Sequence, residues 1–195
     1  MVLVIMNVKW QWKIIIINND LFVFLYYYNN YNNMDNLLEK FEEIFLRHLP
    51  YEPYTLQYVY IYDWLILGDV RDAVLLNTDA VLSVFNDADY YKAYFSNKEW
   101  CVIDIMDHPD ENIEIHFEKA FEFLDNIKKQ NKTCIIHCHA GINRSATIAL
   151  AYYIKNKRIN LFEAYDFLSY MRPGIIYNIG FRKQLINWAL INSLI

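Results

Sequence analysis

HCHAGINRSAT, from His137 to Thr147, is the stretch that decides the fold of this 195-residue chain. The apolar run before it, from Thr133 to Ile136, predicts a short buried strand, and the run after it, from Ala146 to Ile154, predicts a helix. The residues between Cys138 and Arg144 therefore form a strand-to-helix loop. Such a loop directs backbone N–H groups inward at the positive end of a helix dipole, which favours a bound dianion and a thiolate alike. We therefore expect Cys138 to be largely ionised at neutral pH and to act as a nucleophile.

The same run matches the signature H-C-x-x-G-x-x-R-[ST], so the chain resembles the cysteine-based protein tyrosine phosphatases. The resemblance implies that Cys138 attacks phosphorus to form a phosphocysteine and that Arg144 binds two non-bridging phosphate oxygens. It implies that Ser145 stabilises the thiolate when it leaves, that His137 supports the loop from behind, and that Gly141 supplies a backbone shape that a Cβ would obstruct. The phosphate-binding loop implied in this way consists of His139, Ala140, Gly141, Ile142, Asn143 and Arg144.

Cleavage of a phosphate ester also needs a proton donor near the leaving oxygen. Residues 100–105 predict a strand, residues 107–112 a polar loop, and residues 113–129 an amphipathic helix. This passage resembles the general-acid loop and following helix of the dual-specificity phosphatases, which implies that Asp107 is the general acid. Asp110 is the alternative, because its proline-aspartate pair is similar to the tryptophan-proline-aspartate loop of the larger tyrosine-specific enzymes.

Two further stretches extend the resemblance, from about Met34 to about Leu194. YDWLILGDVRDAV, residues 62–74, is similar to the leucine-glycine motif of the family, where a strand ends at a glycine and a helix begins. RPGIIYNIGFRKQLINW, residues 172–188, resembles the family's R-P…N-x-x-F-x-x-Q-L pattern, which implies that Asn178 supports the phosphate loop. We also expect Asn160 to cap a helix and Gly180 to permit a break before the last helix.

The order of strands and helices predicts an α/β fold with a single domain, in which helices flank a central mixed, mainly parallel sheet. Ligands of such sheets bind beyond the carboxyl ends of the strands, which is where Cys138 falls. We expect residues 34–195 to form the catalytic domain. Residues 1–33 are rich in Ile, Tyr and Asn and lie outside the family pattern. We expect them to form a poorly ordered extension or a dimer-contact arm, with Met34 as an alternative start, and we expect no membrane span, because Asn18, Asn19 and Asp20 interrupt the apolar residues.

The resemblance implies a small dual-specificity phosphatase, similar to compact viral members, that acts on phosphotyrosine, phosphoserine and phosphothreonine in proteins. Three cysteines without a disulfide framework, one of them a catalytic thiolate, predict a reducing, cytoplasmic setting. We expect phosphorylated proteins as partners, with a homodimer as an open possibility. Neither a metal nor an organic cofactor is expected, because His137 and His139 have no second Cys/His pair to complete a metal site.

Three other functions remain open. An RNA 5'-triphosphatase or diphosphatase shares the signature and the asparagine before the arginine, here Asn143, but the formal net charge of −5 argues against a nucleic-acid substrate. A phosphoinositide phosphatase usually carries lysines within the loop, and this loop has none. A catalytically inactive phosphate-binding module is disfavoured because nucleophile, arginine and acid are all present.

Overall fold

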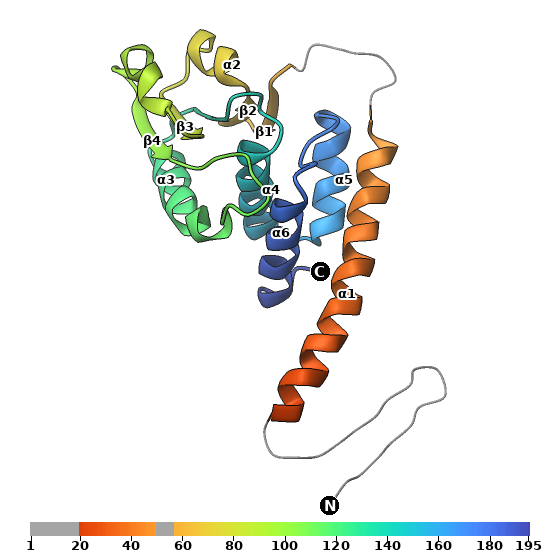
Figure 1. Cartoon of the computed structure of the whole chain (residues 1–195). Coiled ribbons are helices and arrows are strands. Elements are labelled where there is room, and N and C mark those ends of the chain that lie inside the picture. Colours follow the sequence, from red (N-terminus) through yellow and green to blue (C-terminus); the bar gives the residue numbers. More distant parts are fainter. Residues whose placement is uncertain (1–19, 50–56) are drawn as a thin grey trace, which may run out of the picture. The chain divides into compact units, whose positions relative to one another are not determined.

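A computed structural model describes residues 20–49 and 57–195 of the chain, with side chains from Met34 onward (Figure 1). By its internal contacts the chain divides into two units, Met1–Glu39 and Lys40–Ile195. Helix α1 (Asp20–Arg47) crosses this boundary. Residues 1–19 of the expected extension lie outside the described residues, and residues 20–33 belong to α1. The expected dimer arm and the domain boundary at residue 34 stay predictions.

Five strands of the described residues form one sheet in the order β1-β2-β5-β3-β4. They are β1 (Val59–Tyr62), β2 (Leu65–Gly68), β3 (Ala80–Val84), β4 (Glu99–Ile103) and β5 (Cys134–His137). β1 is antiparallel to β2, and all other pairs are parallel, which confirms the predicted mixed, mainly parallel sheet. Every residue of the central strand β5 is buried, as its continuous apolar run requires. The register pairs His137 with Gly68 on one side and with Ser83 on the other, so three strands end beside the phosphate loop.

Helices pack on both faces of the sheet (Figure 1). On one face, Ala73 of α2 and Phe95 of η1 form a core cluster with Ile66, Val81 and Ile135 of the strands. On the other face, α4 packs against β2, β3 and β5 and is itself in contact with α3, α5 and α6. The bounds of these helices are α2 (Val70–Leu75), η1 (Ala88–Phe95), η2 (Glu114–His116), α3 (Phe117–Lys129), α4 (Arg144–Lys157), α5 (Leu161–Met171) and α6 (Ile179–Ile191).

Local capping signals place the helix starts that surround the site. Asp69, directly after the glycine that ends β2, caps α2 in a complete capping box with Asp72. Asn160 caps α5 as predicted, and Asn178 caps α6. The break expected at Gly180 is wrong, because this glycine lies inside the first turn of α6. Its actual role is a close approach: a Cβ there would overlap the carbonyl of Pro109.

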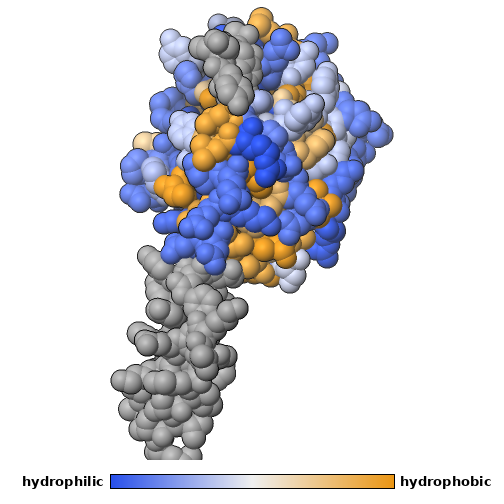
Figure 2. Space-filling view, turned by 90° about the vertical axis from the view of Figure 1, so that its right-hand side faces the viewer, coloured by the Kyte–Doolittle hydropathy of each residue, from blue (hydrophilic) through white to orange (hydrophobic). Residues whose placement is uncertain are grey.

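The helix predicted over residues 113–129 begins as the short 3-10 helix η2, and its α-helical part starts at Phe117. On the face shown in Figure 2, hydrophobic residues form separate patches among hydrophilic ones. Within the part of the chain that the structure describes, no helix combines the length and the apolar character needed to cross a bilayer.

Candidate active site

Cys138 follows β5 directly, and its side chain is buried. Its Sγ accepts hydrogen bonds from the backbone N–H of Gly141 and from the hydroxyl of Ser145, both at 3.2 Å. Two donors aimed at one sulfur, together with the N-terminus of α4, suit a negatively charged thiolate. The expected nucleophile and the expected thiolate stabiliser are therefore in direct contact.

Six consecutive carbonyl groups, from Cys138 to Asn143, each accept a hydrogen bond from a group outside residues 138–143. In loop order, the donors are His137 Nδ1, Val70 N, Arg172 Nη2, Arg172 Nε, Ile176 N and, for the last carbonyl, both N and Oγ1 of Thr147. In a trans peptide the N–H points opposite to the C=O. Carbonyls that all face outward therefore turn the following N–H groups toward the centre of the loop, where an anion would bind.

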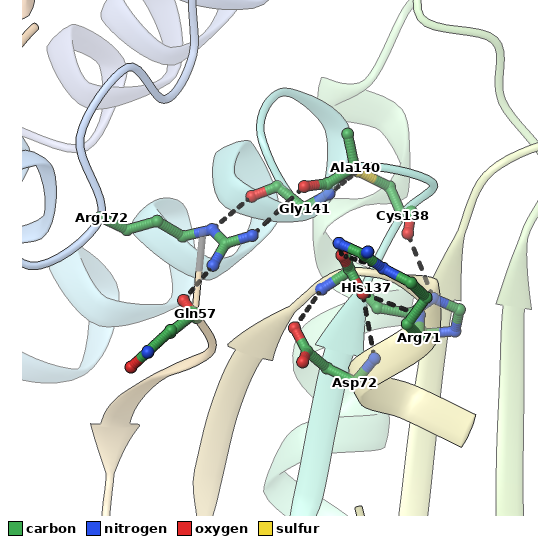
Figure 3. A network of polar contacts seen from close by, with 9 residues as sticks. Gln57, Arg71, Asp72, His137, Cys138, Ala140, Gly141 and Arg172 are labelled. Carbon is green, nitrogen blue, oxygen red and sulfur yellow. Dashed lines mark hydrogen bonds and ion pairs between the residues drawn. The ribbon is translucent and has the colours of Figure 1, made fainter. Parts of the chain in front are cut away.

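Arg172 supplies the bond to two of these carbonyls (Figure 3). Its side chain is buried, and it donates from Nε to Gly141 O at 2.7 Å, from Nη2 to Ala140 O at 3.2 Å, and from Nη1 to Gln57 O. Gly141 itself has φ +66°, and a Cβ at this position would overlap the carbonyl of Gly68. Only glycine fits both the backbone angle and the contact.

His137 contacts the loop at the end of a chain of hydrogen bonds that begins at the half-buried Trp100. Trp100 Nε1 donates to Ser83 Oγ at 2.8 Å, and His137 Nε2 lies 2.7 Å from the same oxygen. His137 Nδ1 lies 3.3 Å from Cys138 O, and because a carbonyl can only accept, Nδ1 carries the proton of the neutral ring and Nε2 accepts from the Ser83 hydroxyl. Burial lowers the pKa of His137 to about 4, which keeps the ring neutral at neutral pH.

Arg144 lies in the first turn of α4 with its guanidinium partly anchored. Nη1 donates to Ile105 O at 3.1 Å and to Asn86 Oδ1 at 3.3 Å. The buried Nε has no hydrogen-bond partner among the residues that the structure describes. Since a buried, unpaired donor on a cation is costly, this N–H is the group that a bound anion would satisfy. Asp107 Oδ2 lies 4.0 Å from the same Nε.

Asp107 is held by two asparagine side chains. Asn143 Nδ2 donates to its Oδ2 at 3.0 Å, and Asn178 Nδ2 donates to its Oδ1 at 2.9 Å. The rival acid, Asp110, behaves differently: its side chain is 92% exposed and faces His108 at 3.6 Å. Of the two candidate acids, Asp107 is thus the one that lies beside Arg144.

The segment after Asp107 is fixed on α6. The backbone of Pro109 contacts Gly180, and the amide of Gln184 accepts from Ile113 N at 2.7 Å and donates to Glu111 O at 2.8 Å. Together with Asn178, one helix holds this loop at three points along its first two turns.

Comparison with known families gives this geometry a context. Residues 65–190 match the model of a family described as dual specificity phosphatase, catalytic domain. The chain belongs to the dual specificity phosphatase family. Human dual specificity protein phosphatase 5 is 33% identical over 113 residues, which are 58% of this chain and 29% of the relative. Mouse dual specificity protein phosphatase 19 is 31% identical over 134 residues, which are 67% of this chain and 61% of the relative. The chain therefore spans less than two thirds of the length of either relative.

Solved structures share the dual specificity phosphatase fold. OH1 from the Orf virus, a tyrosine phosphatase described as having triple substrate specificity, superposes with a TM-score of 0.61 at 21% identity, over 76% of this chain and 96% of OH1. At this identity the likeness shows the fold.

The structure of this family member brings most of the residues named from the sequence into one place. Of the loop residues, His139 and Ala140 are exposed, Ile142 is half-buried, and Gly141, Asn143 and Arg144 are buried. Sequence reasoning missed Ser83, Trp100 and Asn86, which hold the residues that were named. Asn86 carried a usable signal, because it follows a buried parallel strand at the edge of the sheet where ligands bind.

Proposed function

We propose that this chain hydrolyses phosphotyrosine, phosphoserine and phosphothreonine in proteins through a phosphocysteine on Cys138. The observation that carries the proposal is the Cys138 sulfur with its two donors, at the base of a loop whose N–H groups face inward. The unpaired Nε of Arg144 and the Asp107 carboxyl lie 4.0 Å apart at the same place.

In the first step, the Cys138 thiolate forms a P–S bond while the P–O bond to the leaving oxygen breaks. Arg144 and the inward N–H groups bind the non-bridging oxygens, whose charge they neutralise. Asp107, protonated at this stage, gives its proton to the leaving oxygen.

In the second step, water attacks the phosphocysteine. The Asp107 carboxylate accepts a proton from the water as the new P–O bond forms and the P–S bond breaks. The Ser145 hydroxyl donates to the sulfur as it becomes a thiolate again, which is the contact already present at 3.2 Å. Inorganic phosphate then leaves, and the starting state is restored.

The substrate class rests on membership of the dual specificity phosphatase family and on the similarity to OH1. Phosphorylated proteins are therefore the proposed partners. A catalytic thiolate needs a reducing compartment, which supports the cytoplasm as the location.

Phosphate release from a doubly phosphorylated Thr/Tyr peptide and from a 5'-triphosphorylated RNA oligonucleotide tests the proposal, with wild type and Cys138→Ser compared in the presence of a chelator. Release from both peptide positions that depends on Cys138 is the expected result. Release confined to the RNA would move the chain to RNA phosphatases with the same nucleophile. Turnover retained by Cys138→Ser would contradict the assignment of the nucleophile.

A further inference from the structure

Asp107, Asn143 and Asn178 come from three separate segments: the loop after β4, the phosphate loop, and the residue before α6. The two asparagines are buried, with exposed fractions of 1% and 5%. Their amides meet the two oxygens of one carboxyl group, one donor to each oxygen. We name this arrangement of the three residues the amide clip.

The direction in which each amide faces is dictated by the backbone. Asn178 Oδ1 accepts from the N–H groups of Gly180 and Phe181, at 3.0 and 3.3 Å, as the cap of α6. Asn143 Oδ1 accepts from the N–H of Asn178 at 3.2 Å. Backbone N–H groups can only donate, so both amide oxygens are occupied and both Nδ2 groups must point at Asp107.

The clip leaves the acid able to carry and to lose a proton. A carboxylate has about four lone-pair sites, and the two amides use one on each oxygen. One site on each oxygen therefore remains for a proton, for the leaving oxygen or for a water. The clip fixes the plane of the carboxyl group beside Arg144 without occupying the sites that the chemistry requires.

We propose that Asn143 and Asn178 are positioning residues that hold Asp107 in the orientation in which it protonates the leaving group. This inference rests on the proposed phosphatase function. It assigns a second role to Asn143, a member of the phosphate loop, because this side chain also connects that loop to the acid and to the cap of α6.

The dependence of the rate on the leaving group distinguishes positioning of an acid from general support of the fold. Phenyl phosphate has a poor leaving group and needs the proton, whereas 2,4-dinitrophenyl phosphate expels a stable anion and does not. Asn143→Ala is expected to lower kcat/KM for phenyl phosphate about 10-fold more than kcat/KM for 2,4-dinitrophenyl phosphate. Asn178→Ser, whose hydroxyl can still cap α6 but which lacks the Nδ2 donor, should show the same selective loss.

Two controls complete the experiment. Asn160→Ala removes a cap of the same type from α5, far along the chain from Asp107, and should lower both rates equally or not at all. In an Asp107→Asn background the acid is already absent, so Asn143→Ala should add no further dependence on the leaving group.

Equal losses on both substrates in Asn143→Ala and Asn178→Ser would overturn the inference. It would also be overturned if Asn143→Ala made the rate more dependent on the leaving group in the Asp107→Asn background. Failure of the proposed function has a different signature. It would appear as turnover of 2,4-dinitrophenyl phosphate that does not require Cys138.

Discussion

The imidazole of His137 is fully buried, with Ser83 Oγ beside Nε2 and Cys138 O beside Nδ1. The carbonyl of Cys138 can only accept, so Nδ1 carries the proton of the neutral ring. A second ring proton would place a charge in this buried site, and burial disfavours the charged form. The residue behind the proposed nucleophile is therefore sensitive to low pH.

We expect this sensitivity to appear in the stability of the protein. The pKa of His137 is about 4 in the folded chain and 6.5 in its ordinary setting, so between these values the unfolded chain binds a proton that the folded chain does not. The contribution of the neutral His137 ring to the free energy of unfolding is fully present above pH 6.5. It is lost as the pH drops toward 4, by up to about 3 kcal/mol. Urea denaturation at pH 7 and pH 5 measures this loss. His137→Asn cannot titrate and should flatten the dependence of stability on pH. The control His108→Asn, at an exposed position, should leave this dependence unchanged. If His137→Asn also left it unchanged, the pH dependence would not come from His137.

At the scale of residues, local sequence patterns could be used for prediction, whereas contacts between distant segments could not be predicted. The run from His137 to Thr147 predicted that Cys138, Arg144 and Ser145 lie together, because they are close in one loop, and Ser145 does contact the Cys138 sulfur. The contact between Asn143 and Asp107 joins segments 36 positions apart. Nothing in either segment specifies which side chain the other will present, so the sequence placed both residues near the phosphate but not in contact.

Helix α6 is the element that holds Asp107, the proposed general acid. Its cap holds the carboxyl of Asp107, its first turn contacts Pro109, and its second turn holds the backbone of residues 111–114 through Gln184. The loop that carries Asp107 is therefore packed against a helix. The contact is closest at Gly180, where a Cβ would overlap the Pro109 carbonyl.

Gly180→Ala should reduce acid catalysis although alanine favours helices by about 1 kcal/mol over glycine. The added Cβ would overlap the carbonyl of Pro109. Relief of this overlap requires the loop that carries Asp107 and Pro109 to move away from α6. We expect a loss of about 10-fold in kcat/KM for phenyl phosphate, with a much smaller loss for 2,4-dinitrophenyl phosphate. Gly174→Ala is the control, since its Cβ would meet no described atom within 4 Å and its φ of +72° costs stability only. Equal rates for Gly180→Ala and wild type would show that the contact is not required.

At the scale of elements, the sequence predicted the strand and helix on either side of the phosphate loop, and the caps at Asn160 and Asp69 agree with local rules. The 3-10 helix η1 and the irregular start of the helix after the acid loop were not predicted. Their course is set by packing of Phe95 and Ile113 into the core, which a pattern of period 3.6 does not describe.

Across the whole molecule, Arg172 connects regions that are far apart in the sequence. It follows α5, binds two carbonyls of the phosphate loop, and also binds Gln57 just before β1. A buried guanidinium can serve three carbonyls at once because its donors form a planar fork, which an ammonium group cannot reproduce. The shape of the phosphate loop thus depends on the same side chain that connects the end of α5 to the region before β1.

Arg172→Lys should therefore lower the free energy of unfolding by about 3 kcal/mol and weaken the binding of inorganic phosphate, because the loop carbonyls lose their fixed partners. Urea denaturation and phosphate titration of the same protein measure both effects. Arg71→Lys, at an arginine whose side chain is 73% exposed, should leave the stability nearly unchanged. A variant that keeps its phosphate affinity while losing stability would separate the two roles and contradict this connection.

The position of α6 in the chain has a consequence for biosynthesis. A ribosome makes Cys138, Arg144 and Asp107 before it makes the helix on which the Asp107 loop packs. Phe181 and Leu185 of α6 are fully buried in the core, and a domain generally folds as a unit. The order of translation thus postpones assembly of the proposed active site until α6 has left the exit tunnel.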